Sequence, residues 1–117
     1  DSAKVVLDAL QMPLSVAEYL EARQQLLVRL FPGAEPMPGA VRLSRHLHRA
    51  GVPQAVATSS DGYYFDLKIT RHRDWFRIFQ CVVLGDDPEI ANGKPAPDIF
   101  LLAAKRLRAK PDARRWR

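Results

Sequence analysis

The feature that most constrains the fold is an alternation of short apolar runs with helical patterns between residues 38 and 108. The runs VPQAVAT (residues 52–58) and FQCVVLG (residues 79–85) are strand-like, and the second is apolar on both faces, which is typical of a buried parallel strand. Helical patterns occupy residues 39–51, 63–72 and 96–108. Strands that alternate with helices favour a parallel sheet with right-handed crossovers. We therefore predict an α/β fold.

The first 31 residues do not follow this alternation. Residues 14–31 carry apolar side chains at a helical period, and Ser15 and Glu18 have the spacing of a capping box. A turn-rich segment with three prolines follows before residue 39. We predict a division into a helical part, residues 1–35, and an α/β part, residues 36–117.

Polar residues follow each predicted strand. The segment TSS (residues 58–60) follows the first, and the loop of residues 85–98 after the second holds Lys94 between a glycine and a proline. Open parallel sheets bind ligands beyond the carboxyl ends of their strands, and hydroxyls and free N–H groups suit phosphate. Residue order and type thus suggest a phosphate site made of Thr58, Ser59 and Lys94. The pattern alone favours the alternative that residues 58–60 only cap the next helix.

The positive charge of the chain is concentrated at one end. Of the 18 Lys and Arg residues, seven lie in residues 105–117, and the rest of the chain is close to neutral despite the net charge of +5. We interpret this basic tail as a helix end followed by a solvated segment, because basic residues suit a helix C-terminus. An RNA-binding arm is the alternative interpretation.

A single cysteine, Cys81, lies within an apolar run. We expect it to be a buried small hydrophobe and not a nucleophile, and one cysteine without a partner indicates an intracellular protein. No signal peptide is recognisable, and no apolar run approaches the ~18 residues that a membrane span needs. We therefore expect a cytoplasmic protein without a membrane partner.

The histidines and aromatic residues have structural interpretations. His46 and His48 are two positions apart in a predicted helix, so they point in different directions and make a poor metal pair. We expect both at the surface, and we expect His72 to pack against a helix end. The aromatic residues between positions 75 and 79 are interpreted as core, although a stacking platform for a base is an alternative.

The segments VATSS, RHRDWFRIF and VVLGDDPEIANGKPAPDIFLLAAKR together resemble the haloacid dehalogenase (HAD) superfamily of phosphatases. The resemblance covers nearly the whole chain. It implies a Rossmann-like core with an inserted helical cap, so residues 1–35 would be the C-terminal part of the cap and residues 36–117 a partial core. It also implies that Thr58 hydrogen-bonds the transferred phosphoryl group and that Lys94 neutralises its oxygens, which would make both residues catalytic.

Two parts of the resemblance are missing from the sequence. The superfamily attacks phosphate with an Asp-x-Asp pair, and no such pair occurs in this chain. It also uses acidic Mg²⁺ ligands, but Asp86 and Asp87 precede Lys94, and Ile90 stands where a further acid is required. We interpret Asp86 and Asp87 as part of a turn and expect the Mg²⁺ ligands outside this chain. The expectation is an internal fragment that is inactive alone, with an open edge on the strand at residues 52–58.

The resemblance implies hydrolysis of a nucleoside 5′-monophosphate, such as pseudouridine 5′-phosphate, through an aspartyl-phosphate. One alternative is a sugar-phosphate phosphatase or phosphoglucomutase of the same fold. Another is a non-enzymatic, truncated binding module that acts through the basic tail. The expected partner is a small phosphorylated substrate and not a nucleic acid, and the oligomeric state stays open.

Overall fold

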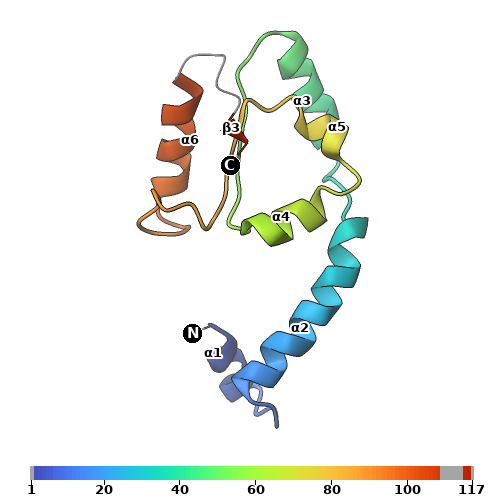
Figure 1. Ribbon diagram of the computed structural model, residues 1–117, viewed down its shortest axis with the longest axis vertical. Helices are drawn as coiled ribbons and strands as arrows, with labels where there is room; N and C mark the ends of the chain where they lie inside the picture. Colours follow the sequence, from blue (N-terminus) through green and yellow to red (C-terminus); the bar gives the residue numbers. More distant parts are fainter. Residues whose placement is uncertain (1, 109–114, 117) are drawn as a thin grey trace.

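The structure is a computed structural model that describes residues 2–108 and 115–116 (Figure 1). Along the described residues the elements are α1 (Ser2–Ala9), α2 (Val16–Leu30), the 3-10 turn η1 (Phe31–Gly33), α3 (Ala40–Arg49), β1 (Ala55–Ala57), α4 (Gly62–Lys68), α5 (Arg73–Phe76), β2 (Cys81–Val83), α6 (Asp98–Arg108) and β3 (Arg115–Trp116). The predicted alternation of helices and strands is confirmed.

A parallel sheet with the strand order β1-β2-β3 forms the centre of the α/β part. Ala55 of β1 lies opposite Cys81 of β2, and Ala57 lies opposite Val83. The sheet therefore confirms the predicted α/β class, and β1 is an edge strand among the described strands, as expected. Arg115–Trp116, within the tail that was expected to be solvated, form a strand that pairs with β2. The tail residues 109–114 and 117 lie outside the described residues.

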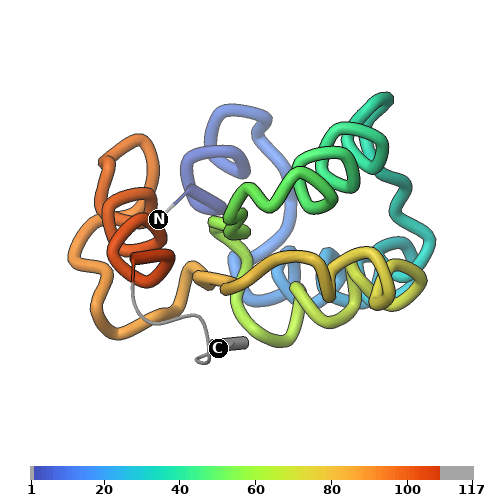
Figure 2. Tube along the Cα trace, turned by 90° about the horizontal axis from the view of Figure 1, so that it is seen from above, coloured from blue at the N-terminus to red at the C-terminus, as the bar shows by residue number. Residues whose placement is uncertain are grey.

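The buried strand β2 divides the core into two apolar clusters. Val82 and the following Leu84 pack with Phe65 and Ile69 from the α4 side. Val83 points to the opposite face and packs against α6 through a cluster that comprises Ile99, Leu102 and Ala103. Successive side chains of a strand point to opposite faces, so an apolar run is needed to bury both sides. Figure 2 shows α6, in orange-red, on one side of the sheet and α4 and α5, in yellow-green and yellow, on the other.

Two helix ends follow the chemistry that the sequence indicates. The Ser15 hydroxyl accepts a hydrogen bond from the Glu18 N–H at 3.1 Å, so Ser15 is confirmed as the N-cap of α2. The Glu18 carboxylate accepts from the Ser15 hydroxyl at 3.0 Å. α3 ends in a Schellman motif, in which Gly51 has a φ of +77° and its N–H bonds the carbonyl of His48. Only a residue without a Cβ adopts that backbone conformation freely.

The helices α1 and α2 extend away from the sheet at one end of the molecule (Figure 1). The radius of gyration is 16.9 Å, whereas a compact domain of this length has one of about 13 Å. α1 buries Ala3 and Leu7, but α2 buries none of its residues, and its Leu20 and Leu30 are 42% and 65% exposed. None of the described helices, α2 included, is long and apolar enough to cross a membrane. The division at residue 35 stays a prediction.

Candidate functional site

The loops that follow β1 and β2 lie against each other at the carboxyl ends of the strands. The Thr58 N–H donates to the Val83 carbonyl at 3.0 Å, and the Gly85 N–H donates to the Ser60 carbonyl at 2.8 Å. A Cβ at position 85 would overlap the backbone carbonyl of Ser59. Gly85 is therefore required for the close approach of the two loops, which brings the hydroxyl segment of residues 58–60 beside the loop after β2.

Lys94 reaches back from that second loop to the end of β1. Its Nζ donates to the Ala57 carbonyl at 3.0 Å and lies 5.2 Å from the centroid of the Phe100 ring. The Ala57 carbonyl belongs to the peptide group that joins Ala57 to Thr58, so the ammonium lies next to the predicted hydroxyl segment. The side chain of Lys94 is exposed and thus accessible to a ligand.

The hydroxyl segment is not the cap of α4. That cap is Asp61, whose carboxylate accepts the Tyr64 N–H at 2.9 Å. The Thr58 hydroxyl accepts the Ser60 N–H at 3.1 Å, which leaves the proton of the hydroxyl as a donor. The alternative that residues 58–60 serve only as a helix cap is therefore wrong.

A cavity of about 430 Å³ opens beside these strand ends. Its lining comes from α2, η1, the loop after β1, α4 and the loop after β2, and comprises Arg23, Leu27, Phe31, Ser59, Ser60, Asp61, Tyr64, Lys68, Gly85 and Asp86. The size lies in the range of sites for small molecules. Of the three predicted site residues, Ser59 lines this cavity. Thr58 lines a more apolar hollow on the α4–α5 side of the sheet, and Lys94 is not in the lining of either cavity.

The cavity contains two cations that sequence reasoning missed, Arg23 and Lys68. The Lys68 Nζ donates to the Ser60 hydroxyl at 2.7 Å and lies 4.5 Å from the centroid of the Phe31 ring. Arg23 forms neither a hydrogen bond nor an ion pair with any residue that the structure describes. No local pattern identifies this pair, because Arg23 and Lys68 are brought together by the packing of η1 against α4.

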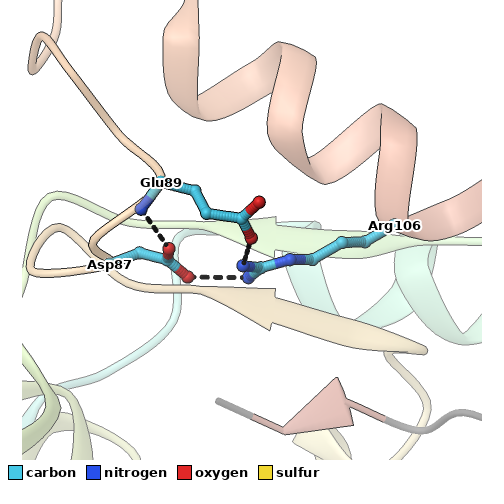
Figure 3. A network of polar contacts seen from close by, with 3 residues as sticks. All are labelled: Asp87, Glu89 and Arg106. Carbon is cyan, nitrogen blue, oxygen red and sulfur yellow. Dashed lines mark hydrogen bonds and ion pairs between the residues drawn. The ribbon is translucent and has the colours of Figure 1, made fainter.

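A network of three charges joins the loop after β2 to α6 (Figure 3). Arg106 binds the carboxylates of Asp87 and Glu89, each at 2.8 Å, and the Asp87 carboxylate accepts the Glu89 N–H at 2.9 Å. The side chains of Arg106 and Asp87 are only 12% and 11% exposed. Burial raises the pKa of Asp87, but the hydrogen bonds from Arg106 and from the Glu89 N–H outweigh it and leave the pKa below its ordinary value. The turn predicted at Asp87 is confirmed, and the network fixes it to α6.

The described residues of this chain do not form a Mg²⁺ site. They contain no group of three or more His, Cys, Asp or Glu side chains that could hold a metal ion. Asp87 is committed to Arg106, so Asp86 is the remaining carboxylate of the pair. A hard cation such as Mg²⁺ requires several oxygen ligands in octahedral geometry.

The other conspicuous side chains have structural roles. Cys81 is buried, and burial raises its thiol pKa despite the nearby charge of Arg106, so it is a small hydrophobe and not a thiolate nucleophile. A His72 ring nitrogen lies 2.6 Å from the Ala34 carbonyl, and the Trp75 indole N–H donates to the Ser44 hydroxyl at 2.7 Å. These contacts support the predicted packing roles of His72 and of the aromatic segment.

Comparison with known proteins gives a consistent set of matches. A family model for haloacid dehalogenase-like hydrolases matches residues 5–113. (DL)-glycerol-3-phosphatase 2 of Arabidopsis thaliana is 48% identical over 98 residues, which cover 84% of this chain and 41% of that protein. A probable pseudouridine-5′-phosphatase of Drosophila melanogaster is 43% identical over 110 residues, or 93% of this chain and 48% of that protein. This chain thus spans less than half the length of either relative.

Proposed function

Because this chain belongs to the haloacid dehalogenase-like hydrolase family, we propose that it supplies the phosphate-binding part of a phosphomonoester hydrolase. The observation that carries this function is the contact between the Lys94 ammonium and the Ala57 carbonyl, at the carboxyl end of β1. It supports a site in which a fixed positive charge lies beside the hydroxyl segment of residues 58–60.

We assign roles to three residues in this site. Lys94 neutralises the oxygens of the phosphoryl group, and its fixed attachment to the end of β1 means that little reorganisation is needed when negative charge develops. The Thr58 hydroxyl, whose oxygen already accepts a hydrogen bond from the Ser60 N–H, donates a hydrogen bond to a phosphoryl oxygen. Ser59, which is exposed and lines the cavity, offers a further hydroxyl.

The reaction as a whole needs groups beyond these three. Covalent phosphoryl transfer requires a nucleophile, and the Asp-x-Asp pair of the superfamily does not occur in this sequence. Mg²⁺ is proposed for the whole protein on the family resemblance alone, because the described residues do not form a site for it. We therefore assign binding and charge stabilisation to this chain, and no step through the metal. A cytoplasmic location also stays a prediction.

The proposed substrate is the phosphate monoester of a hydroxyl-bearing alcohol. A nucleoside 5′-monophosphate such as pseudouridine 5′-phosphate is the leading candidate, since a relative at 43% identity is named as a probable pseudouridine-5′-phosphatase. Glycerol 3-phosphate is the second candidate, because two relatives at 48% identity are named as glycerol-3-phosphatases. A phosphomutase of the same fold has no such support.

Titration calorimetry of this chain with inorganic phosphate tests the proposed site. Replacing Lys94 with Met keeps the apolar stem and removes the charge, and we expect the Kd for phosphate to rise at least about tenfold, as for the loss of one charged hydrogen bond. Lys105→Met is the matched control, because Lys105 lies exposed on α6 and does not line the cavity. Equal phosphate affinity for both variants would contradict the assignment of Lys94.

A further inference from the structure

The geometry points to Lys68 as a specificity-determining residue that binds a hydroxyl of the alcohol part of the substrate. This inference rests on the proposed function, since it requires the phosphoryl group to be held at the neighbouring strand ends. It separates two tasks between two lysines. Lys94 would bind the phosphoryl group, and Lys68 would distinguish one phosphate ester from another.

Lys68 is held in position by contacts from two directions. Its ammonium donates to the Ser60 hydroxyl at 2.7 Å, and it lies 4.5 Å from the centroid of the Phe31 ring. The Phe31 ring also meets the Tyr64 ring edge-on, with centroids 5.7 Å apart. These contacts join α4 to the end of the helical arm, by which we mean α1, α2 and η1. The ammonium is therefore held at the point where the helical arm meets the α/β part. A fixed donor loses little freedom when it binds a ligand.

The ammonium also has unused capacity to donate. A lysine ammonium has three N–H donors, and one of them is used by Ser60. No other described residue accepts a hydrogen bond from Lys68. Lys68 lines both the 430 Å³ cavity and the apolar hollow beside Thr58, so a molecule that enters the cavity can reach its remaining donors.

The charges that line the cavity indicate the kind of group that Lys68 binds. Two cations, Arg23 and Lys68, are matched by two carboxylates, Asp61 and Asp86. In such a site the two carboxylates would repel a second phosphate as much as the two cations attract it. A neutral polyol can accept hydrogen bonds from the cations and donate them to the carboxylates. Leu27 and Phe31 add an apolar wall. The lining therefore fits a glycerol or ribose unit better than a bisphosphate.

The experiment compares glycerol 3-phosphate with methyl phosphate, a monoester that lacks the free hydroxyls. We expect the unmodified full chain to bind glycerol 3-phosphate about tenfold more tightly by calorimetry. Lys68→Met should remove this preference and leave the Kd of methyl phosphate unchanged, because only the bond to the alcohol is lost. Lys105→Met should keep the preference.

The possible outcomes separate this inference from the proposed function. Equal weakening of both esters by Lys68→Met would make Lys68 part of the phosphate site and overturn the inference, as would no change in either. Failure of the unmodified chain to bind either ester, or unchanged binding of both by Lys94→Met, would overturn the proposed function itself.

If Lys68→Met does not fold, as judged by circular dichroism, the unmodified chain still decides the question. The difference between the ¹H–¹⁵N NMR shifts induced by the two esters should then be concentrated at Ser60, Tyr64 and Lys68. A difference confined to residues outside the cavity would overturn the role of Lys68.

Discussion

At the scale of single residues, Arg106 shows how a charge remote in sequence fixes the loop that carries Lys94. Its guanidinium binds Asp87 and Glu89, and the side chains of Arg106 and Asp87 are nearly buried. Asp87 follows β2, and Arg106 lies in the last turns of α6. The network therefore joins the two ends of residues 87–106, the segment that contains Lys94.

We expect Asp87→Asn to lower the free energy of unfolding by about 1–3 kcal/mol at neutral pH, because Arg106 loses a charged, buried partner. The folded-state pKa of Asp87 is depressed, so its stabilisation is present above the ordinary pKa of about 3.9 and is lost as the pH falls through the folded-state value. Urea unfolding of both proteins at pH 7 and pH 3 measures this. A difference that does not shrink at pH 3 would count against the network, and Glu89→Gln, at a carboxylate 55% exposed, should cost less.

Gly85→Ala tests the contact between the two strand-end loops. The added methyl group would overlap the Ser59 backbone, which cannot move without breaking the Gly85–Ser60 hydrogen bond. We expect a loss of about 1–3 kcal/mol in the free energy of unfolding, together with weaker phosphate binding. Gly33→Ala is the control, because a Cβ at position 33 has nothing within 4 Å. Equal stability of the two variants would show that the loops are not in contact.

At the scale of elements, the sequence predicted β1, β2 and the helices α2, α3 and α6 for physical reasons that act locally, whereas the helix predicted over residues 63–72 ends at Lys68. The apolar run at residues 79–85 became β2 with all of Cys81–Val83 buried, and Ser15 caps α2 as predicted. β3 could not be predicted, because Arg115–Trp116 lack an apolar run and form a strand only by pairing with β2. The local sequence predicts an element such as β2, whose own side chains are apolar enough to be buried. It does not predict an element such as β3, which forms only by pairing with another strand.

The end of α3 gives a test at this scale. Ala at position 51 must adopt a φ of +77°, which costs about 1–2 kcal/mol for a residue with a Cβ. We expect Gly51→Ala to lower the Tm in a circular-dichroism melt, and Gly51→Asn to lower it less because Asn tolerates the left-handed conformation. The same Tm for Gly51→Ala and the unmodified chain would mean that α3 does not end in the Schellman motif.

At the scale of the whole molecule, the candidate site is assembled from segments far apart in sequence. Lys94 donates to the Ala57 carbonyl at the end of β1, and its role in phosphate binding stays a prediction. The cavity does not follow from any motif, because Arg23, Lys68 and Asp86 come together only through the packing of the helical arm on the α/β part. Thr58 and Ser59 line different cavities, which residue type alone did not reveal.

The central claim is that a phosphate group binds at the carboxyl end of β1, and ¹H–¹⁵N NMR of the full chain during titration with inorganic phosphate tests it most directly. We predict that the largest shift changes fall on the amides of Thr58, Ser59 and Ser60, with Lys94 following, and that Lys94→Met removes them. Changes concentrated instead in the basic residues beyond Lys105, with residues 58–60 unaffected, would contradict the claim and favour a binding module that acts through its charged tail.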